Sequence, residues 1–265
     1  MTNPEDTLKF ALAQKTFSVD ALSVRVYDCE ANMAQDAAQL AQDYLQDAIA
    51  RQGSAAIILA TGNSQIKFLD ALIAKDGINW SKITLFHLDE YLGIEAEHPA
   101  SFRHYLRQRV GNQVRPAFFH YIEGDAMQPL DECDRYTQLL QQQPIDLCCL
   151  GLGENGHLAF NEPALTSFNE TRKIKLVKLD HITRQQQLKQ GHFPYLEAVP
   201  QYAFTLTIPM ICSVEKIFCL APEKRKALPV KNLLQGEIST AIPSSVLRQQ
   251  QQATLFIDLD AASLL

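Results

Sequence analysis

No apolar run in this sequence approaches the roughly 20 residues that a membrane-spanning helix requires. The first ten residues include acidic side chains and no long apolar core, so they do not resemble a secretory signal. Six cysteines are present, but none forms a C-x-x-C pair, which leaves a zinc or redox motif unsupported. Four of them lie in apolar runs, as buried free thiols do. We therefore expect a cytoplasmic protein that does not engage a membrane.

Positive charge is also scarce. The 265 residues include 24 basic and 30 acidic side chains, for a formal charge of −6, which argues against a broad nucleic-acid-binding surface. A few local cations in a pocket could still hold a small anion. No Gly/Ser-rich or Pro-rich linker divides the chain. We expect a single domain over residues 1–265, with residues 1–20 as a loose N-terminal arm.

Short apolar runs alternate with amphipathic segments along most of the chain, which is the pattern of an α/β fold. Because the runs are apolar on both faces, we expect a doubly wound, mostly parallel sheet with helices on both sides, a Rossmann-like three-layer αβα fold. The first strand–helix unit lacks a G-x-G-x-x-G fingerprint, so no nicotinamide or other cofactor is expected. The main predicted strands are Leu22–Tyr27, Ala55–Ala60, Ile83–Leu88, Ile145–Leu150, Tyr202–Ile208, Ile217–Leu220 and Thr254–Leu259.

A glycine-rich loop follows the predicted strand Ile145–Leu150, with glycines at 151, 153 and 156. Such a loop lets the backbone turn sharply and approach a ligand closely. His157 comes directly after the last glycine and could transfer a proton near neutral pH. Glu162 could orient this histidine if the loop folds back. A tight turn with a surface histidine would give the same pattern, and no metal-ligand motif accompanies His157.

A second loop, Thr61–Gln65, joins the strand Ala55–Ala60 to a helix predicted over Ile66–Ala74. Free N–H groups and the helix dipole favour an anion at such a position. Ser64 could donate a hydrogen bond to that anion or only cap the helix.

Adjacent carboxylates, Asp89 and Glu90, follow the strand Ile83–Leu88. Either could perform acid–base chemistry, but neighbouring residues on a strand face opposite ways and are not expected to act on one atom. One of them could instead cap a helix or form an ion pair.

The loop sequence GLGENGHLAFNEP resembles the signature of the glucosamine-6-phosphate deaminases, and the related 6-phosphogluconolactonases differ after the G-H core. The segment Asp89–Gly93 resembles the D-E-Y-x-G motif of the same family, and Lys226 fits its G-x-x-K-A element. The turn Thr61–Gln65 is similar to the family's T-G-G-T-P loop, with Asn63 and Gln65 as departures. The resemblance spans residues 55–247 and implies conversion of D-glucosamine 6-phosphate and water to D-fructose 6-phosphate and ammonia.

The same resemblance implies roles for individual residues. Asp89 is expected to move the proton between C2 and C1, and His157, supported by Glu162, to assist ring opening. Some members carry Asp where this chain has Asn155, which can orient His157 but cannot stabilise its cation by charge. Glu90 is expected to act on neighbouring site residues and not to contact the substrate itself. The implied phosphate-binding residues are Thr61, Gly62, Asn63, Ser64, Lys226 and either Lys189 or Arg184.

Alternatives remain at this stage. The sugar could be galactosamine 6-phosphate, because a C4 epimer is not readable from the sequence. A lactonase hydrolysing 6-phosphogluconolactone would use a similar phosphate site, and a non-catalytic sugar-phosphate sensor is a third alternative. The expected partner is a sugar phosphate, and assembly into a homo-oligomer is also open. Lys224, Arg225 and the glutamine clusters at 141–143, 185–187 and 249–252 are interpreted as solvated surface.

Overall fold

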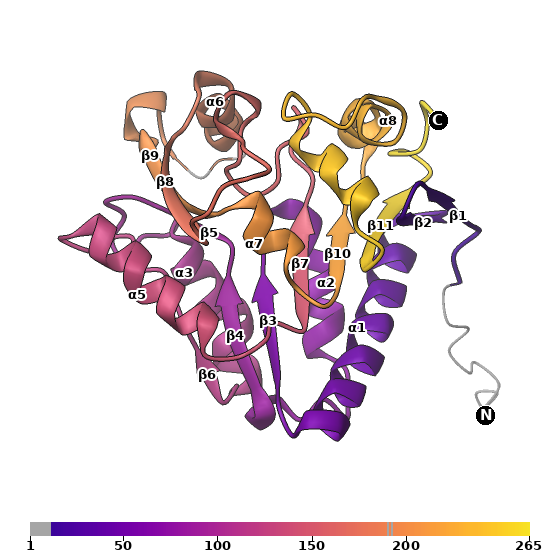
Figure 1. Cartoon of the computed structure of the whole chain (residues 1–265), viewed down its shortest axis with the longest axis horizontal. Helices are drawn as coiled ribbons and strands as arrows, with labels where there is room; N and C mark the ends of the chain where they lie inside the picture. The colour runs from indigo at the N-terminus through magenta and orange to yellow at the C-terminus, as the bar shows by residue number, and fades with distance from the viewer. Residues whose placement is uncertain (1–11, 190, 192) are drawn as a thin grey trace, which may run out of the picture.

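The computed structural model describes residues 12–189, 191 and 193–265. Its centre is an eight-stranded sheet in the order β1-β2-β11-β10-β7-β3-β4-β6, seen in Figure 1. All neighbouring strands in this sheet are parallel except β1 and β2, so the predicted fold class is confirmed. The strands are β1 (Lys15–Val19), β2 (Leu22–Tyr27), β3 (Ala55–Leu59), β4 (Ile83–His87), β6 (Phe118–Phe119), β7 (Leu147–Gly151), β10 (Ile217–Leu220) and β11 (Ala253–Asp258).

Helices cover both faces of this sheet. The long helix α1 (Glu30–Gln52) packs beside α2 (Asn63–Ile73) on one face, whereas α5 (Pro129–Gln141) and α8 (Ala227–Gln235) contribute to the core on the other. Alternate residues of β3 point into the two cores, with Ile57 on the α1 side and Ile58 on the α5 side. The remaining helical segments are η1 (Trp80–Lys82), α3 (Phe102–Leu106), η2 (Arg107–Gly111), α4 (Asn112–Val114), η3 (Pro163–Leu165), α6 (His181–Lys189), η4 (Leu196–Ala198), α7 (Ile208–Cys212), η5 (Lys224–Lys226) and η6 (Pro243–Gln249).

A second sheet, which the sequence analysis did not predict, has three antiparallel strands in the order β5-β9-β8. They are β5 (Asp89–Tyr91), β8 (Ile174–Lys178) and β9 (Tyr202–Leu206). Leu88 connects the two sheets, because its N–H donates to Leu59 of β3 while its C=O accepts from Leu206 of β9. The first residue of the small sheet is therefore Asp89.

Two predicted boundaries need correction. The expected loose arm over residues 1–20 contains β1, which pairs antiparallel with β2 through Lys15–Val19, while residues 1–11 lie outside the described part. The helix after β3 starts at Asn63 and not at Ile66. Gly62 makes this earlier start possible, because its φ of 96° is a backbone conformation that glycine adopts without strain.

Four neighbouring strands, β10, β7, β3 and β4, end at the same edge of the large sheet. The loops that leave them carry most of the predicted site residues, so topology brings these residues together. Among the described residues, no helix is both long enough and apolar enough to span a membrane.

Candidate active site

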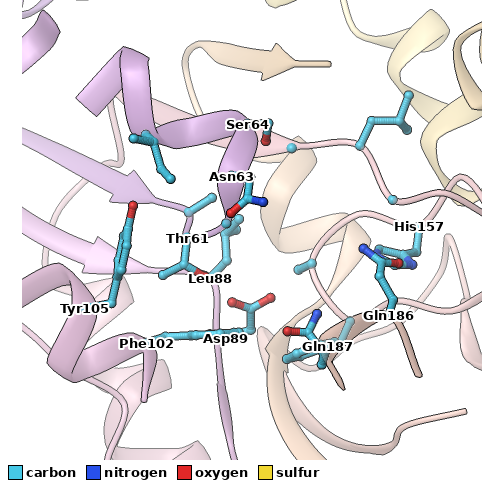
Figure 2. A pocket seen from close by; sticks show the side chains of 18 of the residues that line it. Thr61, Asn63, Ser64, Leu88, Asp89, Phe102, Tyr105, His157, Gln186 and Gln187 are labelled. Atoms are coloured by element: carbon cyan, nitrogen blue, oxygen red, sulfur yellow. The ribbon is translucent and has the colours of Figure 1, made fainter. Parts of the chain in front are cut away.

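A pocket lies at the carboxyl ends of these strands. It is lined by the Thr61–Ser64 turn, Asp89, His157 and Lys226, all of which were predicted as site residues. Figure 2 shows the side chains of Thr61, Asp89 and His157 in close-up, with Asp89 between the Thr61 turn and the helix that contributes Gln187. Phe102 and Tyr105 form an aromatic wall that the sequence analysis missed.

Asp89 begins β5 and is 8% exposed. Burial raises the pKa of its carboxyl group well above the ordinary value, and the negative charge of Glu90 raises it further. A carboxylate with a raised pKa can accept and return a proton near neutral pH. The position and the electrostatics of Asp89 therefore suit a base that moves a proton within a bound substrate.

Glu90 faces away from the pocket, as expected for the neighbour of Asp89 on a strand. Its fully buried carboxylate accepts hydrogen bonds from the Ser101 hydroxyl at 2.8 Å and from the backbone N–H groups of Tyr91, Phe102 and Arg103. Two of these N–H groups belong to the first turn of α3. Glu90 thus fixes the helix that carries Phe102 into the pocket wall, and its role is positional.

The buried ring of His87 holds the backbone of Asp89 through a hydrogen bond. Its Nε2 accepts the N–H of Ile122 at 2.8 Å, so Nδ1 carries the proton and donates to the backbone oxygen of Asp89 at 2.9 Å. Burial lowers the pKa of His87 to about 3, which keeps the ring neutral. The hydroxyl of Tyr136 bridges the N–H and C=O of His87. The backbone before Asp89 is held in one conformation by these bonds.

The ring of His157 lies directly over Gly153. A Cβ built on Gly153 would fall 2.3–2.4 Å from three atoms of the imidazole, so only glycine leaves room for the ring in this place. The ring Nδ1 lies 3.4 Å from Oε1 of Glu162, within ion-pair range, although its geometry does not meet that of a hydrogen bond. The expected folding back of the loop toward Glu162 is therefore present.

Glu162 is held by more than the histidine. Asn155 donates to its Oε2 at 2.6 Å and accepts the backbone N–H of His157 at 3.1 Å, while the Thr183 hydroxyl donates to its Oε1. Burial raises the pKa of Glu162, but His157, Thr183 and Asn155 together outweigh burial and bring it below the ordinary value. The carboxylate is therefore ionised at neutral pH and can stabilise an imidazolium. Asn155 orients this pair through the loop backbone.

The Thr61–Ser64 turn presents the start of α2 to the pocket. The Ser64 side chain does not cap the helix, and the amide of Gln65 donates to its Oγ at 3.2 Å. Ser64 Oγ can therefore direct its own proton toward a ligand. The first-turn N–H groups of an eleven-residue helix favour an anion here, and the binding of a phosphoryl group by this turn stays a prediction.

Lys226 is almost fully buried and its Nζ donates to the backbone oxygen of Leu152 at 2.6 Å. Burial, with the neighbouring charge of Arg225, lowers the pKa of Lys226 to about 8. Arg225 also lines the pocket, which corrects its interpretation as surface.

Two predicted phosphate ligands do not reach the pocket. The guanidinium of Arg184 donates to the backbone oxygens of Leu196 and Val199, and Lys189 is exposed at the end of α6. The same helix instead contributes Gln186 and Gln187, which the sequence analysis placed on the solvated surface. They lie three and four residues after the buried Thr183 and so share its helix face, but nothing in the sequence distinguishes that face from the exposed one.

Among the described residues, no group of three or more His, Cys, Asp or Glu side chains is arranged to hold a metal ion. The six cysteines are free thiols.

Comparisons with known proteins agree on one family. Residues 28–256 match the family described as glucosamine-6-phosphate isomerases/6-phosphogluconolactonase. Glucosamine-6-phosphate deaminase 1 of Bacillus subtilis is 33% identical over 247 residues, which cover 91% of this chain and 99% of that protein. The glucosamine-6-phosphate deaminase of Lactobacillus delbrueckii subsp. bulgaricus is 32% identical over 233 residues, 88% of this chain and 96% of that protein.

Solved structures give the same picture. A structure described as a monomeric glucosamine-6-phosphate deaminase matches with a TM-score of 0.84 at 32% identity, over 91% of this chain and 99% of that one. A 6-phosphogluconolactonase from Shewanella baltica OS155 matches with a TM-score of 0.74 at 20% identity, over 93% and 99%. The second likeness is one of fold alone.

Proposed function

Since this chain belongs to the family of glucosamine-6-phosphate isomerases and 6-phosphogluconolactonases, we propose that it is a glucosamine-6-phosphate deaminase. The reaction converts D-glucosamine 6-phosphate and water to D-fructose 6-phosphate and ammonia. One observation supports this assignment above the others: Asp89 and the His157–Glu162 pair line or adjoin one pocket with Lys226. An aldose–ketose proton transfer requires a base and a second proton-transfer group beside an anchored phosphate.

In the proposed mechanism, Lys226 and the Thr61–Ser64 turn hold the phosphoryl group. His157 moves a proton between the C1 hydroxyl and the ring oxygen as the sugar ring opens, and Glu162 stabilises the imidazolium that forms. Asp89 then takes the C2 proton while the ammonium group of the substrate gives a proton to the C1 oxygen, so that a neutral enolamine forms, and Asp89 returns its proton to C1. Water adds to the resulting iminium carbon at C2, ammonia leaves, and the ketose remains.

The pocket environment suits these steps. Burial around Asp89 favours its protonated form, so the aspartic acid formed after proton abstraction is stable enough to deliver the proton to C1. Glu162 must instead stay ionised, and its contacts with His157, Thr183 and Asn155 lower its pKa and so favour the ionised form. Two carboxyl groups with opposite pKa shifts thus have two different roles.

The proposed cellular setting is the cytoplasm, and the proposed partner is the sugar phosphate itself. Six free cysteines, four of them buried, support a reducing compartment. Assembly into a homo-oligomer stays a prediction.

Ammonia release from glucosamine 6-phosphate, measured beside galactosamine 6-phosphate and 6-phosphogluconolactone, tests the proposal. We expect release from glucosamine 6-phosphate and slow turnover of the other two substrates. Release from the galactose epimer alone would correct the sugar and keep the reaction. If the folded protein releases no ammonia but hydrolyses the lactone, the deaminase assignment is wrong.

A further inference from the structure

The pocket contains a second cation whose role the family motifs do not assign. Among the described residues, the only lysine and arginine side chains that line the pocket are Arg225 and Lys226. A phosphate monoester carries close to two negative charges at neutral pH. Lys226 supplies at most one positive charge, and one of its three donors is already used by the Leu152 carbonyl. A second positive group is needed to balance the ligand.

We propose that Arg225 binds the phosphoryl group of the substrate together with Lys226. This inference rests on the proposed function, because it names a ligand of that same site. The side chain of Arg225 is 29% exposed, so its guanidinium is accessible and also shielded enough to form strong hydrogen bonds. A guanidinium can offer two parallel N–H groups to a phosphate, which a lysine cannot.

Carboxylates hold the guanidinium in place. Nε of Arg225 donates to Glu223 at 2.6 Å, and one terminal nitrogen lies 3.4 Å from Glu154. These contacts engage Nε and Nη1 and, within the described residues, leave Nη2 without a protein acceptor. The contact with Glu154 is the longer of the two, so a ligand oxygen can compete with it.

The backbone at Glu223 gives independent support. Its φ of 78° is a conformation that residues with a side chain rarely adopt, and the glycine of the G-x-x-K-A element falls at this position when Lys226 is its lysine. The N–H of Glu223 is held by the carboxylate of Asp258 at 3.1–3.2 Å. A glutamate here has a conformational cost that glycine avoids, and the side-chain contact it gains is the one with Arg225. Glu223 therefore acts as a positioning residue for the guanidinium.

Calorimetric titration with fructose 6-phosphate and with inorganic phosphate tests this proposal on the full chain. For Arg225→Gln we expect both ligands to bind about tenfold to a hundredfold more weakly. The KM for glucosamine 6-phosphate should rise by a similar factor, with a much smaller change in kcat, and Arg225→Lys should recover part of the loss. The matched control is Lys224→Gln, which removes the adjacent exposed charge outside the pocket and should leave binding unchanged.

The outcomes separate this inference from the assignment of the reaction. Unchanged phosphate affinity in a folded Arg225→Gln variant would overturn the inference, even if the parent releases ammonia. An equal loss in Lys224→Gln would also overturn it, because the effect would then be one of general charge. Weakened phosphate binding in Arg225→Gln alone would uphold the inference even if no ammonia is released by the parent.

Glu223→Gly tests the positioning step. This variant should melt no lower than the parent, because the backbone conformation suits glycine, while fructose 6-phosphate binds more weakly and loses nothing more when Arg225→Gln is added. A tighter complex in Glu223→Gly would show that the carboxylate only repels the phosphate, and Glu223 would then have no part in the proposal.

Discussion

The two ends of the pocket are built differently. At the end with Asp89 and His157, both side chains are at least four-fifths buried. Buried neighbours support them, because His87 bonds to the backbone of Asp89 and Glu162 lies beside the ring of His157. At the proposed phosphate end, the start of α2 meets a buried lysine and a partly exposed arginine that are adjacent in η5. Proton transfer depends on angles and distances, whereas an anion can be bound by cations that approach from several directions. The structure brings together the residues that the motifs predicted for the first end, whereas Arg184 and Lys189, predicted for the second end, lie outside the pocket.

The largest effect is expected from Asp89→Asn, which keeps the shape of the side chain and removes its basicity. We expect kcat for ammonia release to fall by about 10³-fold or more, toward the upper range for loss of a general base. Binding of fructose 6-phosphate should change little, because the phosphate end is intact. Substantial ammonia release by this variant would assign the base to another residue.

A smaller loss is expected from Gly153→Ala, which acts on the same end without removing any reacting group. The added methyl would overlap the imidazole, so the ring of His157 must move. A displacement of about 1 Å can cost roughly 10²-fold in rate. We expect kcat to fall within that limit while titrations with inorganic phosphate match the parent. Weakened phosphate binding would mean that the two ends are not independent.

The phosphate end should respond to pH. Because Lys226 has a pKa of about 8, its positive charge is present below pH 8 and is lost as the pH rises through that value. The affinity for fructose 6-phosphate should therefore fall by up to about tenfold per pH unit above 8, the limit set by one proton. Titrations between pH 7 and pH 9.5 measure this slope, and a flat profile would contradict the role of the lysine.

The smallest effect is expected from Lys189→Gln. Sequence reasoning placed this lysine on the phosphate, but the structure leaves it exposed at the end of α6 and outside the pocket. KM should change by less than about twofold, because a solvated charge outside the site is screened by salt. A tenfold rise in KM would restore Lys189 as a ligand and would require α6 to move when substrate binds.

Sequence reasoning located the strands, the long helices and the polar loops that follow them, because these depend on local patterns of apolar and polar residues. The run Leu22–Tyr27 led directly to β2, and the apolar run Ala55–Ala60 to β3. The three-stranded sheet was missed, because β5 is only three residues long and its pairing with β9 joins segments more than 100 residues apart. Non-local pairings of this kind leave no local periodic signal.

The candidate site shows the same limit. Asp89 and His157 could be located because glycines and carboxylates surround them in the sequence. Gln186, Gln187 and Arg225 could not, because polar side chains on short helical segments look alike whether they face solvent or a pocket. Their assignment depends on how α6 and η5 are oriented, which the tertiary fold decides.

The two backbone hydrogen bonds of Leu88 determine where Asp89 lies relative to the two sheets. It is bonded to β3 of the large sheet through its N–H and to β9 of the small sheet through its C=O, and Asp89 follows it. Asp89 therefore belongs to the three-stranded sheet, whereas the Thr61 turn and Lys226 follow strands of the large sheet. Because Leu88 bonds to both sheets and residues of both sheets share one hydrophobic core, the separation between Asp89 and the proposed phosphate site is set by the packing of the two sheets and not by a single loop.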